Sequence, residues 1–307
     1  MEKAFAPEGV YAAMVTPFDG LGHIDHNAVQ DMMDFLAAHG ADGVFPVSNV
    51  GEFLTLSQDE KLALIASATE ATGGRIKVMP GVTELCIERA LALCRAAKDA
   101  GADGVVLSTP YYYRHPQAYT MTYMQTIAEH SPLPVTLYHS PKFANPIGLD
   151  NLMTLLSHEN ITAVKESSGD IRFLMQLMER IRAENLDVNV LLGWEELLLS
   201  GLPYGVKGCV TSCGGIVPEL LRKTIDSFRA GDMEMAAACE RAVTRITNAL
   251  TAYGFPQGYK MGVLARGLRF QIYQSPHMAA MEAELQCEVA GIHTLIETEL
   301  SLLNRQP

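Results

Sequence analysis

The pentapeptide GADGV at residues 40–44 recurs unchanged at residues 101–105, 61 positions further along the chain. Each copy ends an amphipathic segment and begins an apolar run, and glycine suits the left-handed conformation that closes a helix. A looser third copy, GVKGCV, occupies residues 205–210. A shift of 61 residues equals two β–α units of about 30 residues each, the spacing of a (β/α)₈ barrel of about 250 residues.

Short apolar runs with helical patterns between them support this interpretation. Continuous apolar character is typical of parallel strands that are buried on both faces. Ser57 and Glu60 have the spacing of a capping box and open a helix over 61–71, and Asp150 is placed to cap the helix that ends at Leu156. The predicted strands are residues 10–16, 43–47, 76–80, 104–108, 135–139, 162–165, 188–192 and 209–211.

After residue 218 the alternation stops, and helical segments continue to about residue 303. We therefore predict an α/β fold, a (β/α)₈ TIM barrel over residues 1–218. Helices over 219–307 form a C-terminal extension that completes the barrel as one structural unit. The alternative is an open doubly wound sheet, but no G-x-G-x-x-G turn follows any of the predicted strands.

The amino-acid composition argues against several kinds of binding partner, metal site and cellular location. The 307 residues carry a formal net charge of −12, which argues against nucleic acid and anionic membranes as partners. Six cysteines are too scattered for a disulfide framework, and Cys209 and Cys213 lack further nearby ligands for zinc. The N-terminal segment MEKAFAPEGV has no apolar core of signal length, and no run of about 18 apolar residues exists. We expect a cytoplasmic protein without a bound metal.

Chemistry in such a barrel lies at the C-terminal ends of the strands. Lys165 ends the apolar run 162–165, so its amine should lie at the barrel mouth, where burial favours the neutral, nucleophilic form. A neutral amine there could form an imine with a ketone. The alternative is a lysine paired with a carboxylate such as the adjacent Glu166. Tyr138 ends the preceding strand and could relay protons or simply fill space.

Other strand ends offer binding groups. The turn from Ser48 to Glu52 can present backbone N–H groups to a substrate carboxylate, or it can be an ordinary turn. The tyrosines at 111–113 could form a lid, a relay or a subunit contact. His23, His26 and His139 do not have the spacing of a zinc site. No catalytic metal is predicted.

Four motifs together resemble the dihydrodipicolinate synthase / N-acetylneuraminate lyase family of class I aldolases. They are SNVGE at 48–52, PYY at 110–112, YHSP at 138–141 and KESSGD at 165–170. The resemblance extends from residue 15 to Lys260, which is nearly the whole chain.

The resemblance implies a small 2-oxo acid substrate and a role for each matching residue. Lys165 would form an imine with the 2-oxo carbon, so no separate cofactor is needed. Tyr138 would shuttle the proton of the C4 oxygen. Tyr112 would reach a neighbouring subunit's site in a homotetramer built as a dimer of dimers. The backbone of Asn49 and Val50 would hold the pyruvoyl carboxylate.

Departures from the family pattern bear on the substrate. Phe143 stands where dihydrodipicolinate synthases carry an arginine for the aldehyde's carboxylate, and arginine sites of that kind are not replaced conservatively. The segment GWEE at 193–196 resembles the sugar-contacting segment of sialic acid lyases. The resemblance also indicates substrate contacts at Ser48, His139, Gly193, Glu195, Glu196, Val210 and Ser212. We therefore expect a carbon–carbon lyase that reversibly cleaves a 2-oxo-3-deoxy sugar acid or sialic-acid-like substrate to pyruvate and an aldehyde.

The alternatives follow from the same departures. Asn49 and Val50 replace hydroxyl residues of the family's proton relay, and asparagine passes protons poorly. The relay could run through His139 or Ser140 instead, or the reaction could be a 2-oxo acid dehydration. A dihydrodipicolinate synthase with an unusual carboxylate site is a further alternative. An alternative of another class is a catalytically impaired 2-oxo acid binding or regulatory barrel.

Overall fold

The computed structural model describes residues 5–304, so the outermost residues of the two predicted segments, 1–218 and 219–307, lie outside it. So do residues 1–4 of the predicted non-signal N-terminus. The strands are β1 Gly9–Ala13, β2 Gly43–Phe45, β3 Lys77–Val78, β4 Val105–Ser108, β5 Val135–His139, β6 Ile161–Glu166, β7 Asn189–Leu192 and β8 Gly208–Thr211. The helices between them are α1 His26–Ala38, α2 Gln58–Thr72, α3 Ile87–Ala100, α4 Gln117–His130, α5 Leu149–Leu156, α6 Ile171–Ala183 and α7 Leu198–Gly201. After β8 come α8 Pro218–Arg229, α9 Met233–Thr251, α10 Gln257–Ala265 and α11 Ala279–Leu300.

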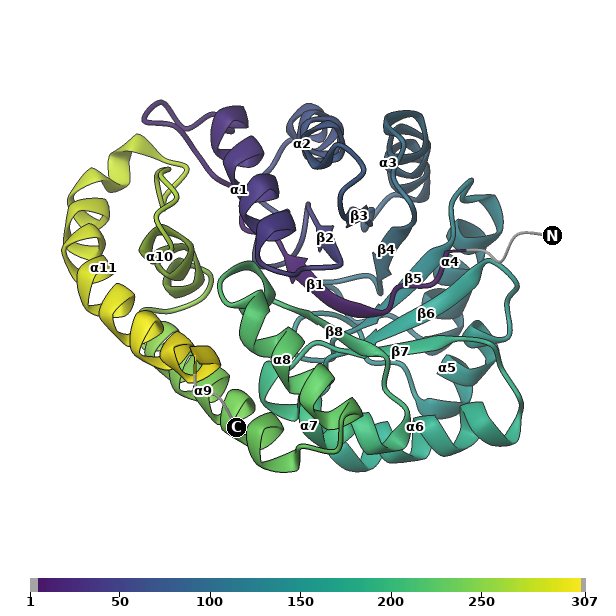
Figure 1. Ribbon diagram of the computed structural model, residues 1–307. Helices are drawn as coiled ribbons and strands as arrows, with labels where there is room; N and C mark the ends of the chain where they lie inside the picture. The colour runs from purple at the N-terminus through teal and green to yellow at the C-terminus, as the bar shows by residue number, and fades with distance from the viewer. Residues whose placement is uncertain (1–4, 305–307) are drawn as a thin grey trace.

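The eight strands are parallel and form one sheet in the order β3-β2-β1-β8-β7-β6-β5-β4. The residues just after β3 meet β4, because Gly81 bridges to Val106 and the N–H of Val106 donates to the Pro80 carbonyl at 2.9 Å. Helices surround the strands, and α9, α10 and α11 gather on one side of the molecule (Figure 1). The predicted (β/α)₈ barrel with a helical extension is confirmed.

The repeated pentapeptide has a structural role in both copies. Gly40 and Gly101 have φ of 86° and 88°, the left-handed conformation expected at a helix end. Asp42 accepts a hydrogen bond at 2.7 Å from the N–H of Val10, and Asp103 accepts one at 2.9 Å from the N–H of Val78. Each aspartate therefore binds the backbone of the neighbouring strand and helps to fix the strand alignment.

The first residues of α2 and α5 test the two predictions about helix caps. The capping box is present, because the Ser57 hydroxyl accepts from the Glu60 N–H at 3.2 Å and the Glu60 carboxylate accepts from the Ser57 N–H at 2.7 Å. The predicted cap at Asp150 is wrong. Gly148 occupies the N-cap position of α5, and the Asp150 carboxylate instead pairs with Arg180 at 3.0 Å.

The C-terminal helices pack against the barrel through apolar faces. Helix α9 buries Val243, Ile246 and Leu250, and in α10 every residue after Gln257 is buried. Since α10 also contacts α9 and α11, the extension shares the barrel's core. Within residues 5–304, no helix is both long and apolar enough to cross a membrane.

Candidate active site

Lys165 lies near the end of β6 with only 5% of its surface exposed. Its Nζ is 4.1 Å from the centre of the Tyr138 ring and 5.2 Å from that of Phe45. Among residues 5–304 it forms no ion pair. Glu166 points to the other face of the strand, where it binds His139 Nδ1 at 3.2 Å. The alternative in which Glu166 neutralises Lys165 is therefore wrong, and Lys165 has no counter-ion in the part of the chain that the structure describes.

A cavity of about 270 Å³ surrounds this amine. It lies at the C-terminal ends of the strands, as the barrel fold requires. The predicted site residues that line it are Asn49, Val50, Tyr138, Phe143, Lys165, Gly193, Glu195 and Ser212. Residues far apart in the sequence thus meet around the amine of one lysine.

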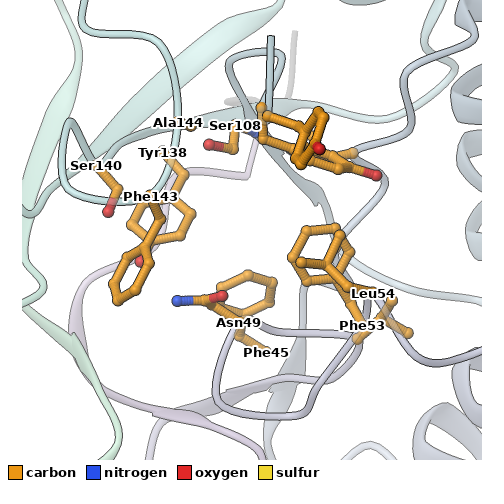
Figure 2. Close-up of a pocket in the computed structure, with 14 residues that line it drawn as sticks. Phe45, Asn49, Phe53, Leu54, Ser108, Tyr138, Ser140, Phe143 and Ala144 are labelled. Carbon is orange, nitrogen blue, oxygen red and sulfur yellow. The ribbon is translucent and has the colours of Figure 1, made fainter. Parts of the chain in front are cut away.

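A second cavity, of about 210 Å³, adjoins the first. The two share Asn49, Tyr138, Ser140 and Phe143 as walls, so they form one site with two lobes. Figure 2 shows the side chains of this second lobe, which is walled largely by aromatic and aliphatic groups. Tyr112 also lines it, with 85% of its surface exposed and φ of 69°.

The turn at residues 48–52 forms one wall of the cavity around Lys165. The Ser48 hydroxyl donates to the Met14 carbonyl at 2.8 Å and accepts from the Gly51 N–H at 3.0 Å. The N–H groups of Asn49 and Val50 have no hydrogen-bond partner among residues 5–304. They are therefore available to an anion in the cavity, whereas Ser48 shapes the turn and does not line the cavity.

Three further predicted contacts also lie outside the cavities. Successive side chains of a strand point to opposite faces, so His139 faces α6 and packs on Phe173, with ring centres 4.9 Å apart. A relay through His139 is therefore wrong. Val210 is fully buried within β8. Glu196 follows Glu195 in a short 3₁₀ turn, Glu195–Leu197, and only Glu195 lines the cavity.

Glu195 supplies a carboxyl group that is almost fully buried. It accepts a hydrogen bond from the Cys213 N–H at 3.1 Å. Burial, and then the charge of Glu196, raise the pKa of Glu195. The pKa of Glu240 is also raised, to about 7, chiefly by burial. A protonated carboxyl at Glu195 can both donate and accept a hydrogen bond, which suits a substrate hydroxyl.

Several lining residues escaped the sequence analysis. Ser167 is 6% exposed, and its hydroxyl has no hydrogen-bond partner among the described residues. It lies two positions after Lys165, so strand alternation could have identified it. Thr251, Phe255 and Tyr259 come from the helical extension, and no local pattern in the sequence places them over the barrel mouth.

Gly193 is required by the packing around the nucleophile. A Cβ at this position would overlap the Ser167 hydroxyl and lie 2.9 Å from Cε of Lys165. Only glycine therefore lets both side chains lie against the end of β7. Within residues 5–304, no cluster of three or more His, Cys, Asp or Glu side chains is arranged to hold a metal ion.

Comparison with known proteins agrees with this geometry. Residues 6–294 match the Dihydrodipicolinate synthetase family. An uncharacterized DapA-like lyase of Pyrococcus horikoshii is 32% identical over 274 residues, covering 88% of this chain and 94% of the relative. The 4-hydroxy-tetrahydrodipicolinate synthase 1 of Streptomyces coelicolor is 34% identical over 245 residues, covering 80% of this chain and 79% of the relative.

A solved structure, the 2-keto 3-deoxygluconate aldolase from Picrophilus torridus, superposes with a TM-score of 0.79 at 26% identity. The match covers 85% of this chain and 93% of the aldolase. Together with the buried lysine in the barrel mouth, these likenesses place the chain among carbon–carbon lyases. The chain belongs to the dihydrodipicolinate synthetase family.

Proposed function

We propose that this lyase reversibly cleaves a 2-oxo-3-deoxy sugar acid or sialic-acid-like substrate to pyruvate and an aldehyde, through an imine on Lys165. The observation that carries the proposal is the buried Lys165 amine, which has no counter-ion among residues 5–304 and lies beside Tyr138 in a cavity. A lysine amine at the C-terminal end of a barrel strand is placed to attack the carbonyl carbon of a ketone and form an imine.

The proposed reaction begins when the Lys165 amine adds to the 2-oxo carbon, and loss of water gives an iminium ion. The N–H groups of Asn49 and Val50 hold the adjacent carboxylate. Tyr138 donates its phenolic proton to the departing water and is left as a phenolate. The phenolate accepts the proton of the C4 hydroxyl, the C3–C4 bond breaks, and its electron pair moves to the iminium to give an enamine. The aldehyde leaves. Protonation at C3 and hydrolysis of the imine then release pyruvate and the free lysine.

The polar side of the cavity favours a hydroxylated aldehyde. Glu195, Ser212 and Thr251 line it, and Ser167 adds a hydroxyl that has no hydrogen-bond partner among the described residues. Such groups select hydroxyls because an apolar analogue would leave them unpaired. The similar structure named as a 2-keto 3-deoxygluconate aldolase supports a sugar acid as substrate.

We further propose that Tyr112 enters a neighbouring subunit's site in a homotetramer. Its ring is largely exposed on the molecule, and its left-handed backbone is costly for a bulky residue. Strain of this kind is usually retained where it serves function. We also propose a cytoplasmic location, which is consistent with the six free thiols.

Dihydrodipicolinate synthesis is the second candidate, because a relative at 34% identity carries that name. Its aldehyde substrate has a carboxylate that needs a cation. Phe143 occupies the position of the synthases' arginine, and no arginine lines either described lobe. Lys142 does line the cavity around Lys165, but its ammonium cannot bind a carboxylate in the bidentate way of an arginine. We therefore rank this activity below the cleavage of sugar acids.

Trapping with borohydride tests the proposal. Pyruvate plus borohydride should add one reduced adduct to Lys165, detected by peptide mass spectrometry, and Lys165→Ala should remain unlabelled. A panel of 2-oxo-3-deoxy sugar acids and sialic acids, assayed for released pyruvate, then identifies the substrate. Failure of wild-type protein to be labelled would refute the imine. Labelling without turnover would indicate a binding barrel, and loss of water without pyruvate would indicate a dehydratase.

A further inference from the structure

Lys260 is a second buried lysine, located on α10 outside both cavities. None of its surface is exposed. Its Nζ forms an ion pair with Glu52, donates to the Ile272 carbonyl at 2.6 Å and lies 4.4 Å from the centre of the Phe18 ring. A buried ammonium is costly unless its surroundings satisfy it. The proposed reaction gives this lysine no part, so its burial needs another explanation.

The partner of Lys260 ends the turn that faces the nucleophile. Glu52 has φ of 57°, and Val47, just before the turn, has φ of 55°. Both are left-handed conformations that are strained for residues other than glycine and persist only where the surroundings hold them. Thr16 also holds the turn, since its hydroxyl donates to the Gly51 carbonyl at 2.6 Å.

Asn49 and Val50 line the cavity together with Lys165, and their N–H groups have no hydrogen-bond partner among the described residues. Their directions depend on the backbone between the two strained positions. A carboxylate bound there is placed relative to the Lys165 amine by that backbone. Anything that fixes Glu52 therefore also fixes where a 2-oxo acid sits.

Lys260 is itself held from the other side. The Ile272 carbonyl accepts a hydrogen bond from Lys260 and belongs to a segment that Glu282 of α11 binds. The Glu282 carboxylate accepts from the N–H of Ile272 at 3.1 Å and from that of Tyr273 at 3.0 Å. A continuous set of contacts thus runs from α11 through Lys260 to the turn.

We infer that Lys260 and Glu52 are positioning residues, which hold the turn at residues 48–52 so that its free N–H groups bind the carboxylate of a 2-oxo acid beside Lys165. The inference rests on the proposed imine chemistry. It gives the C-terminal helices a direct role in substrate recognition, although neither residue of the pair touches the substrate.

The test measures borohydride labelling against the concentration of pyruvate and of pyruvamide, which has the same ketone but no carboxylate. In Lys260→Met, the pyruvate concentration for half-maximal labelling should rise at least about tenfold, as expected for a lost charge-assisted contact. The pyruvamide concentration for half-maximal labelling should stay within about twofold of the wild-type value, and so should the maximal labelling with pyruvate. Glu52→Gln keeps a hydrogen-bond acceptor and should show a smaller shift in the same direction.

Lys61→Met is the matched control. Lys61 is also a buried lysine in an ion pair, with Glu84. Its Nζ lies 5.6 Å from the centre of the Phe53 ring, just after the turn, but no hydrogen bond or ion pair among the described residues joins it to residues 48–52. It should leave both half-saturation values unchanged. An equal rise for pyruvate and pyruvamide, the same rise in Lys61→Met, or no rise in Lys260→Met would each overturn the inference.

Hydrogen exchange separates this inference from the proposed function. Exchange of the peptide covering residues 46–53 should accelerate in Lys260→Met and not in Lys61→Met, whether or not pyruvate binds. If wild-type protein is never labelled but exchange behaves as expected, the imine chemistry is refuted and the structural link remains. Unchanged exchange in Lys260→Met overturns the link itself. If Lys260→Met does not fold, Glu52→Gln serves for both measurements.

Discussion

Replacing the proposed nucleophile should make the protein more stable. Lys165 has 5% of its surface exposed and, within residues 5–304, no anionic partner, whereas its stem packs among Phe45 and Tyr138. Methionine in Lys165→Met has a similar length and fills the same space without a polar terminus. Removing a polar group that has no partner among the described residues is worth about 1–3 kcal/mol when the group is fully buried, and this range is an upper bound here because the amine faces a cavity. We expect the free energy of unfolding to rise by up to that amount while labelling by pyruvate disappears.

The expected gain in the free energy of unfolding corresponds to a measurable rise in Tm. Unfolding entropy is about 2.1 cal/mol/K per residue, or about 0.6 kcal/mol/K for this chain. A gain of about 1–3 kcal/mol therefore raises Tm by about 2–5 °C. Calorimetry and urea unfolding followed by circular dichroism should agree, with an unchanged urea m value.

Lys61→Met provides the contrast, because it removes an equally buried lysine that is paired with Glu84. Removing one partner of a buried ion pair costs about 3–5 kcal/mol, since the other charge stays unpaired. The two variants should therefore shift stability in opposite directions. A Lys165→Met protein that is destabilised as strongly as Lys61→Met would show that Lys165 has an anionic partner, and the reasoning would fail.

Three further predictions concern the site and its surroundings. Gly193→Ala should lower labelling by pyruvate at least about 100-fold, because a misplacement of the Lys165 amine by about 1 Å can have an effect of this size. The circular dichroism spectrum should stay unchanged. Near-normal labelling would contradict the close packing at β7. Because the pKa of Glu240 is raised to about 7, wild-type protein should lose stability relative to Glu240→Gln as pH rises from 5 to 8. The full pKa shift would correspond to a loss of about 3 kcal/mol in the free energy of unfolding, and the partial exposure of Glu240 reduces the expected loss to about 1–2 kcal/mol. Parallel curves of Tm against pH for the two proteins would disprove this prediction. Mixed tetramers of inactive Lys165→Ala and impaired Tyr112→Phe subunits should regain pyruvate release, because some sites would combine an intact Lys165 with a neighbour's Tyr112; no gain on mixing would count against the shared site.

The sequence predicted the barrel because its repeat has a physical cause. Gly40 and Gly101 end helices, and Asp42 and Asp103 bind the backbone of the preceding strand, so the same two requirements recur two β–α units apart. Lys165 was equally accessible to prediction, because it ends an apolar strand at the face where barrels carry their chemistry.

Errors in the predicted site arose where a residue matched a family motif but its side chain points away from the cavity. His139 follows Tyr138 and therefore points away from the cavity toward Phe173, whereas Ser167 follows Lys165 by two and points into it. Asp150 lies one residue inside α5, not at its start. The contributions of Thr251 and its neighbours depend on how α9 and α10 cross the barrel mouth, which is set by tertiary packing rather than by a local pattern.

The cavity wall formed by Thr251, Phe255 and Tyr259 has a consequence for how the protein is made. Chains emerge from the ribosome N-terminus first, and domains begin to fold as they appear. All eight strands, with Lys165 among them, are synthesised before this wall and before Lys260. A stalled or truncated chain would carry the nucleophile but not its enclosure. Release of the last helices is thus the event that completes the wall of the cavity around Lys165.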